Sequence, residues 1–177
     1  MDKLFNDELL VPNVRPTKLT DQQKKKMYRD LAKDIIKNKY SDDDDVKSIA
    51  KDLKKLYSND NGFEKAKHLD DYGNVYYNFD GDFIDWLDGM NHKENEILKN
   101  NVRLWVRAHN PIPKFEKGSK LLINKYLNSK LTKDLIVYIT GFKEDEAIYT
   151  LSDDKNKEGG YLITYELVES NCTLIVE

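Results

Sequence analysis

Histidine and cysteine are the side chains best suited to metal binding or nucleophilic catalysis, and in this sequence they are few and scattered. The histidines are His68, His92 and His109, and the single cysteine is Cys172. Metal sites usually draw on close pairs such as His-x-x-x-His or Cys-x-x-Cys, and the sequence contains neither. We therefore expect no metal site and no cofactor. Cys172 lies beside an apolar C-terminal segment, so we interpret it as a small buried hydrophobic residue rather than a catalytic thiol.

Carboxylates are abundant, with 32 Asp and Glu residues, so pairs at helical spacing such as Asp85 and Asp88 are expected by chance. An EF-hand calcium loop needs an acid five residues before its glycine. The residues at that distance before the candidate glycines are Tyr57, His68 and Tyr76. The acidic segment 80–85 could hold a cation weakly, although a turn into an Asp-capped helix explains it more simply. The nucleophile-elbow, Walker and dinucleotide motifs do not occur. The sequence therefore predicts a protein that is not an enzyme.

Charge is plentiful but patterned along the chain. The 177 residues are 39% hydrophobic and 34% charged, with a net charge of -3, which is compatible with a folded core. Residues 15–39 carry nine basic and three acidic side chains, whereas residues 40–94 carry seven basic and fourteen acidic ones. The two blocks could form an electrostatic docking device, or they could be solvated helix faces that partly pair.

Codon bias gives a hint about the source of the chain. Lysines number 25 and arginines 4, and asparagine, tyrosine and isoleucine are also frequent. All except arginine have AT-rich codons, which indicates a low-GC genome such as that of a Gram-positive bacterium or its phage. Single lysines therefore carry little functional information.

Residues 1–19 are predicted to form an extended arm, because the prolines at 12 and 16 interrupt any helix. The arm is apolar rather than polar, so we expect it to dock on its own domain or on a partner. Its candidate contact residues are Leu4, Phe5, Leu9, Leu10 and Val11.

Residues 20–110 are predicted to be a helical module. Thr20 and Gln23 fit a capping box at the start of a helix that ends near residue 39. A second helix is predicted to begin within 41–45 and to stop at the turn residues 58–62.

The rest of this module is predicted from shorter signals. Residues 75–79 indicate a short strand, and residues 83–89 a short helix ended by Gly89. A longer helix is predicted over 92–108, closed by Asn110 and Pro111.

Beyond Pro113 the apolar spacing becomes strand-like. The expected strands are 120–123, 135–140, 148–151, 161–165 and 173–176. Five short strands separated by turn residues favour a small barrel.

The segment Phe115–Ile123 resembles the opening of SH3-like small β-barrels of the KOW or Tudor type, where an aromatic residue and a glycine turn precede an apolar strand. Residues 165–169 resemble the one-turn 3₁₀ segment that precedes the last strand of such barrels. The resemblance covers residues 113–177 and implies an α+β chain: an N-terminal helical module followed by a C-terminal five-stranded SH3-like barrel. Residues 1–112 resemble no family that we identify.

Aromatic residues are the stronger interaction signal, because tyrosine is favoured at protein interfaces. Since strand side chains alternate, some barrel aromatics should face outward, although they could equally fill the core and rim. The candidates are Tyr126, Tyr138, Phe142 and Tyr149.

These features predict a non-catalytic protein-interaction or assembly component, such as a virion tail or connector part of a phage or a mobile-element protein, whose partners are other proteins. The alternative is an inhibitor that binds a host enzyme or nucleic-acid machine through the acidic block. A third hypothesis is nucleic-acid binding through the basic first helix. With no signal peptide and no membrane span in the sequence, we expect a soluble protein in the cytoplasm or in a virion.

Overall fold

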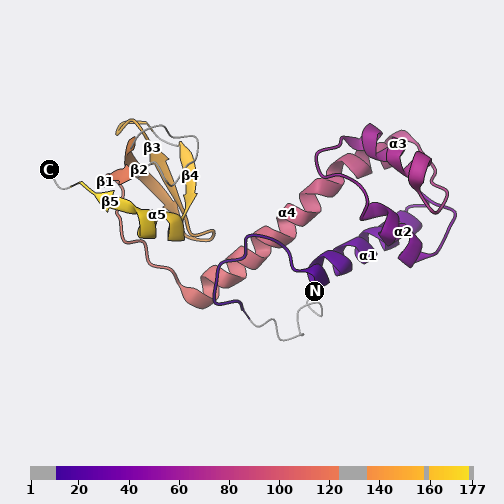
Figure 1. The fold of residues 1–177 in the computed structure, drawn as a ribbon, viewed down its shortest axis with the longest axis horizontal. Helices are drawn as coiled ribbons and strands as arrows, with labels where there is room; N and C mark the ends of the chain where they lie inside the picture. Colours follow the sequence, from indigo (N-terminus) through magenta and orange to yellow (C-terminus); the bar gives the residue numbers. More distant parts are fainter. Residues whose placement is uncertain (1–10, 124–134, 158–159, 176–177) are drawn as a thin grey trace. The chain divides into compact units, whose positions relative to one another are not determined.

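The computed structural model describes residues 11–123, 135–157 and 160–175. The chain divides into two compact units (Figure 1). The helical unit is Pro16–Asn101, and the sheet unit comprises Met1–Arg15 and Val102–Glu177. The division falls inside the longest helix rather than at the proline-rich joint of residues 110–113, so the last turns of that helix belong to the sheet unit.

Capping residues define where the helices of the first unit begin. Helix α1 is Asp21–Lys37, and the expected capping box is present: Thr20 Oγ1 accepts from the Gln23 amide, and Gln23 Oε1 accepts from the Thr20 amide. Helix α2 is Val46–Leu53, and the Asp45 carboxylate caps it by accepting from the Lys47 amide. Each cap satisfies amides that have no partner within the helix.

Residues 62–79 of the helical unit differ from the sequence prediction. Residues 62–72, which carried no assignment, form helix α3, Gly62–Tyr72, with a second capping box between Asn61 and Glu64. The strand expected over 75–79 is instead irregular chain with a single β-bridge between Ser41 and Tyr77. Tyr77 is drawn inward because its ring packs at 5.9 Å from that of Phe83.

Helix α4, Gly81–His109, replaces the two helices expected on either side of Gly89. It runs through Gly89, where a helical glycine costs about 1 kcal/mol relative to alanine. Phe83 and Leu87 before that glycine are fully buried and Met90 after it is 8% exposed. Each such side chain contributes roughly 1.5–3 kcal/mol on burial, so packing outweighs the glycine penalty.

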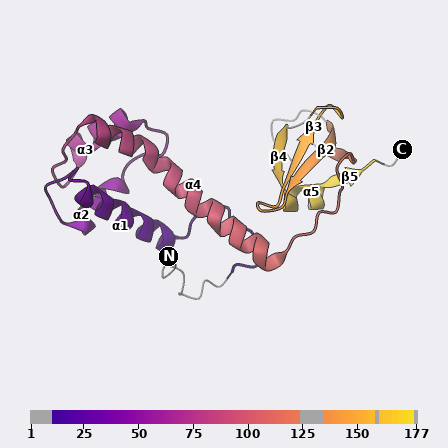
Figure 2. The same cartoon turned by 180° about the vertical axis from the view of Figure 1, so that it is seen from behind.

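The core of the helical unit lies between α1, α2, α3 and the first half of α4, which lie side by side in Figures 1 and 2. Its fully enclosed apolar side chains come from all four helices: Ile35, Ile49, Leu53, Phe83 and Leu87, with Leu69 2% exposed. The only charged side chains buried among the described residues are Asp52 and Lys65. The Lys65 ammonium donates to the Leu87 carbonyl at 3.0 Å, so its charge keeps a partner in the core.

The sheet unit holds a five-stranded antiparallel sheet, in the order β4-β3-β2-β1-β5. Its strands are β1 Lys120–Ile123, β2 Leu135–Lys143, β3 Ile148–Ser152, β4 Tyr161–Thr164 and β5 Cys172–Leu174. All five lie where the sequence places strands, and the class is α+β as predicted. Strand β2 does not end at Gly141 but continues past it, with a register shift between Ile139 and Gly141 that keeps the pairing with β3.

Helix α5, Tyr165–Asn171, stands where a one-turn 3₁₀ segment was expected, and it links β4 to β5. It contacts β3, β4 and β5, and its Val168 side chain is fully buried in the core of the sheet unit. That core is otherwise formed by side chains on one face of the strands: Leu121, Ile123, Val137, Ile139, Tyr149 and Leu151, with Phe115 ahead of β1.

The described part of the N-terminal arm is held by its own chain. The Arg15 side chain is 9% exposed, donates to the Ala147 carbonyl at 2.8 Å and lies 3.8 Å from the Glu166 carboxylate. Leu19 is buried in the core of the helical unit. Residues 15 and 19 thus contact their own chain, while docking through the apolar residues of the arm stays a prediction.

None of the helices in the described ranges combines the length and the apolar character that crossing a membrane requires.

Candidate interaction surfaces

The histidines, the cysteine and the acidic segment named in the sequence analysis can be placed where the structure describes them. In the described part of the chain, no group of three or more His, Cys, Asp or Glu side chains is placed to hold a metal ion. His92 is exposed on α4, and His109 Nδ1 lies 3.0 Å from the Trp105 carbonyl one turn earlier in that helix. In the acidic segment 80–85, Asp80 Oδ1 accepts from the Phe83 amide at 2.8 Å, so this carboxylate caps α4.

Cys172 is half-buried at the start of β5, near Glu169. Burial, followed by the Glu169 carboxylate, raises the pKa of the Cys172 thiol to about 11. The thiolate is the nucleophilic form of cysteine, and at neutral pH it is nearly unpopulated here. This agrees with the interpretation of Cys172 as a packed residue.

The predicted interaction residues fall into different environments. Leu4, Phe5, Leu9, Leu10 and Tyr126 lie outside the described residues. Val11 is exposed, and Tyr138 and Phe142 are half-buried. Tyr149 is fully buried: its hydroxyl accepts from the Phe115 amide at 3.2 Å and donates to the Glu169 carboxylate. Tyr149 is therefore part of the core, and burial raises its pKa.

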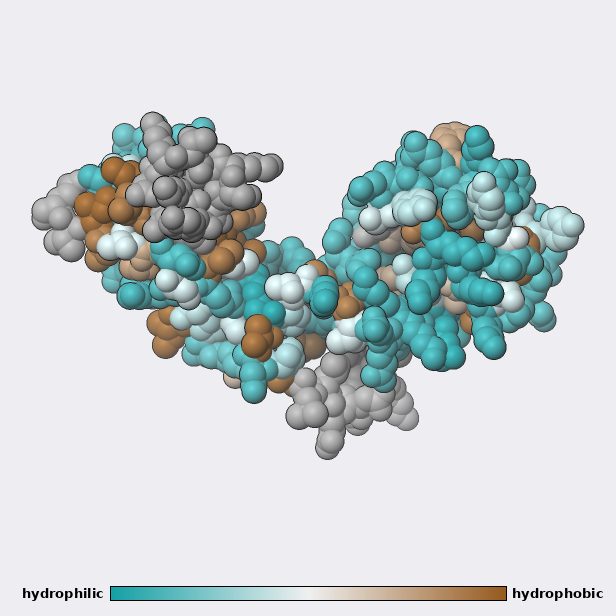
Figure 3. Space-filling view, in the orientation of Figure 1, coloured by the Kyte–Doolittle hydropathy of each residue, from teal (hydrophilic) through white to brown (hydrophobic). Residues whose placement is uncertain are grey.

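Tyr138 lies on the outer face of the sheet, on the opposite side from the buried strand residues. Its register partner on β1 is Lys120, and in the neighbouring position Ile136 pairs with Leu122. Ile136 is 46% exposed, so this face offers a short apolar row beside a tyrosine. Figure 3 shows brown, apolar residues at several places over the sheet unit.

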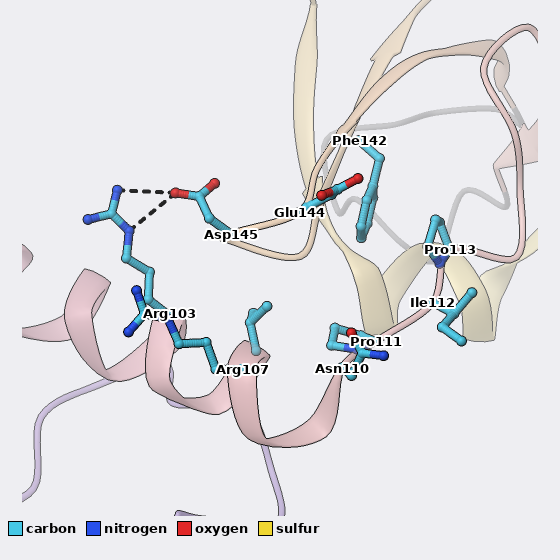
Figure 4. A pocket seen from close by; sticks show the side chains of 10 residues that line it. Arg103, Arg107, Asn110, Pro111, Ile112, Pro113, Phe142, Glu144 and Asp145 are labelled. Carbon is cyan, nitrogen blue, oxygen red and sulfur yellow. Dashed lines mark hydrogen bonds and ion pairs between the residues drawn. The ribbon is translucent and has the colours of Figure 1, made fainter.

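Phe142 borders a cavity of about 650 Å³ within the sheet unit (Figure 4). One wall is the C-terminal end of α4, and the other is the β2–β3 turn. Arg103 closes the rim by pairing with Asp145 through Nε at 3.2 Å and Nη2 at 3.1 Å. Arg107, also on the rim, makes no ion pair with another described residue, and Ile112 is 74% exposed. The cavity therefore combines apolar walls with one available guanidinium.

The helical unit carries five exposed aromatic side chains between residues 57 and 79, which the sequence analysis did not identify as an interaction surface. This aromatic set comprises Tyr57, Phe63, Tyr72, Tyr76 and Phe79, which are 67%, 73%, 66%, 91% and 38% exposed. The rings of Tyr57 and Tyr72 both contact the His68 ring, at 6.0 and 5.1 Å between centroids. Phe63 falls off the buried stripe of α3, so its exposure can be predicted once that helix is assigned. Tyr72 follows the spacing of the stripe and is exposed at the last residue of the helix.

Basic side chains gather on the solvent side of α1. Lys25, Lys26, Arg29, Lys33 and Lys37 are all exposed. Within the described ranges, a single ion pair links the basic segment to the acidic segment, between Lys24 and Glu94 at 3.2 Å. The visible face of the helical unit in Figure 3 is mostly hydrophilic. The two charged blocks are therefore largely left to solvent, with one pair between them.

Comparison of the chain with protein-family models, with curated proteins and with solved structures finds no match.

Proposed function

We propose that this protein is a non-catalytic protein-interaction component that binds another protein through the aromatic set of the helical unit. The observation that carries the proposal is the exposure of five large aromatic side chains within residues 57–79. Large exposed rings are costly to leave in water and are enriched where proteins bind one another. Scattered single exposed residues are normal on a monomer, whereas neighbouring exposed rings, such as Tyr57 and Tyr72 on either side of His68, indicate an interaction site.

Ring contacts within the helical unit favour binding of a partner through the aromatic set. The rings of Tyr57 and Tyr72 each contact the His68 ring, so their rotamers are restrained before a partner arrives. Restrained side chains lose less conformational entropy on binding, at about 0.5–1.5 kcal/mol for each side chain that would otherwise be immobilised. Tyr57 and Tyr72 are therefore the residues we expect to act as hot spots.

The finer architecture that we propose for the sheet unit is an SH3-like barrel. The strand order, with β5 returning to pair β1, and the short helix ahead of β5 support it. Contacts of α5 with β3, β4 and β5 are what a plug at the open end of such a barrel would make. The setting that we propose is assembly of a phage virion or a mobile-element complex.

A host-directed inhibitor is the second candidate, because the acidic block is available to a partner. Asp42, Asp43 and Asp44 are exposed, and none of them forms an ion pair with another described residue. A basic surface of a host enzyme would complement them. In this case the partner is a host protein rather than a virion component.

The test uses a photo-crosslinking amino acid at Tyr76, the most exposed member of the aromatic set at 91%. Crosslinked partners are identified from infected or expressing low-GC cells, purified and titrated against the full chain. The double variant Tyr57→Ser, Tyr72→Ser is expected to weaken binding at least tenfold. The matched control is Tyr161→Ser, Leu162→Ser in the sheet unit, whose side chains are 57% and 56% exposed, and it should change the Kd less than twofold.

Four results separate the possibilities. A virion or mobile-element partner supports the assembly role, and a stoichiometric host enzyme whose binding also requires Asp42–Asp44 supports the inhibitor. Equal weakening by the test and control variants, or no crosslink above that of an exposed sheet-unit position, contradicts binding through the aromatic set.

A further inference from the structure

The exposed face of α1 is a continuous basic stripe. Lys26, Arg29, Lys33 and Lys37 follow one another at spacings of three or four residues, with Lys25 beside them. At 3.6 residues per turn these five side chains fall within roughly 120° of the helix circumference. The stripe from Lys25 to Lys37 extends about 18 Å along the axis at a rise of about 1.5 Å per residue. Asp30 and Asp34 lie at one edge of it rather than within it.

Four of these five cations have no partner among the residues that the structure describes. Lys25, Lys26, Arg29 and Lys37 make no ion pair or hydrogen bond through their side chains to any other residue that the structure describes. Lys33 pairs with Asp30 at 3.4 Å, and both side chains are largely in solvent. In the acidic segment that follows α1, the Asp45 carboxylate accepts from the Lys47 amide and the Ser48 hydroxyl and so caps α2.

We infer that this stripe binds the phosphate backbone of a nucleic acid. Lysines and one arginine lie in a row on this surface, and the other exposed residues of the same helix are polar. Such basic side chains form most contacts between proteins and nucleic-acid phosphates. A protein partner fits it less well, because protein interfaces are depleted of lysine and need an apolar or aromatic centre. A membrane surface fits less well too, since the apolar face that an interfacial helix inserts is here buried in the core: Met27, Leu31 and Ile35.

Binding through these side chains should be independent of base sequence. No aromatic side chain is exposed on α1 to stack on a base, and the stripe offers mostly lysine, which acts as a point charge. If the four cations that have no described partner each neutralise one phosphate, the logarithm of the binding constant falls with a slope of about −3.6 against the logarithm of salt concentration. That slope corresponds to about a 150-fold loss of affinity between 50 and 200 mM salt. This inference goes beyond the proposed protein partner and uses a different surface.

The experiment measures fluorescence anisotropy of a labelled 20-base-pair DNA duplex of arbitrary sequence, titrated with the full chain at 50, 100 and 200 mM salt. The stripe variant replaces Lys25, Lys26, Arg29 and Lys37 with glutamine. The matched control replaces four exposed lysines elsewhere with glutamine, Lys67, Lys143, Lys155 and Lys157. Both variants change the net charge from -3 to -7, so they differ only in where the charge is lost.

The inference predicts salt-dependent binding by the native chain, at least a tenfold loss in the stripe variant at 50 mM salt, and less than a threefold change in the control. Circular dichroism checks that both variants remain helical. Equal losses in the two variants would overturn the inference, as would the absence of binding at 50 mM salt. Poly-glutamate is then added as a competitor at the same charge concentration as unlabelled DNA. Equal competition by the two would also overturn the inference, because the stripe would then bind an acidic protein equally well.

Discussion

Asp52 is the residue whose removal tests the packing of the helical unit most directly. Its carboxylate is 1% exposed and lies at the end of α2, where it joins α2 to the chain that follows α3. It accepts from the Asn74 amide at 2.6 Å, from the Asn74 side chain and from the Tyr77 hydroxyl at 3.2 Å. The Lys55 ammonium lies 3.0 Å away and is 37% exposed. The carboxylate thus organises the residues that were expected to form a strand.

The substitution Asp52→Ala removes one acceptor from three buried or half-buried neutral donors. A hydrogen bond to a charged group contributes about 1.5–3 kcal/mol, so three bonds at the lower value give about 4.5 kcal/mol. Lys55 adds little, because an ion pair with a partner this exposed is screened by solvent. We expect a loss of about 4 kcal/mol from a unit whose whole stability is of the order of 5–15 kcal/mol. The smaller change Tyr77→Phe, which keeps the carboxylate and its other bonds, should cost about 1.5 kcal/mol.

Urea unfolding measures both losses. Trp86 lies against the core of the helical unit, so a Trp105→Phe background makes its fluorescence report on that unit alone. Asp70→Ala is the control, because Asp70 is exposed on α3 and forms no ion pair with a described residue, and its effect should stay within about 0.5 kcal/mol. A loss below about 1.5 kcal/mol for Asp52→Ala would refute the reasoning. It would mean that the cost of burying the carboxylate cancels the hydrogen bonds it accepts.

Two further predictions concern the glycines and the cysteine. Gly89→Ala should stabilise the protein by about 0.5–1 kcal/mol, since nothing lies within 4 Å of the added Cβ and α4 runs through this position. Gly62→Ala should destabilise it by about 2 kcal/mol or more, because the added Cβ would lie 2.3 Å from the Ile84 carbonyl oxygen. Thermal unfolding compares the two variants, and equal shifts in Tm would contradict the packing described for these glycines. Cys172 should react slowly with a disulfide reagent at pH 8, with the rate still rising toward a midpoint near pH 11, because its pKa is raised to about 11 by burial and by Glu169. A rate profile with a midpoint near the ordinary thiol pKa of about 8.5 would show that the thiol is solvated.

Local signals predicted the elements whose formation depends on residues close in sequence. The Thr20–Gln23 capping box predicted the start of α1, and turn residues separated the five strands of the sheet unit. The start of α3 carries the same kind of signal in Asn61 and Glu64, although the sequence prediction treated residues 58–62 only as a turn. Such caps can be read from sequence because the donor and acceptor lie within one helical turn.

Long-range packing decided the features that the sequence analysis missed. Gly89 looks like a helix end because glycine disfavours helix, but the burial of Leu87 and Met90 on either side outweighs that preference. Residues 75–79 have strand-forming side chains but no neighbouring strand, and contacts with Asp52 and Phe83 hold Tyr77 instead. Asp52 lies 25 residues before Tyr77 in the sequence, so no local pattern predicts the hydrogen bond between them.

Sequence alone determined the α+β class, the five strands, the start of the first helix and the clustering of basic residues along it, since each depends on a period or a cap within a few residues. Tertiary structure decided which aromatic side chains are available to a partner. A strand has two faces, and the apolar residues of β3 do not tell which face is inside; packing with Phe115 and Glu169 placed Tyr149 in the core. In the helical unit the core is formed by other side chains, and Tyr57, Tyr72 and Tyr76 stay in solvent.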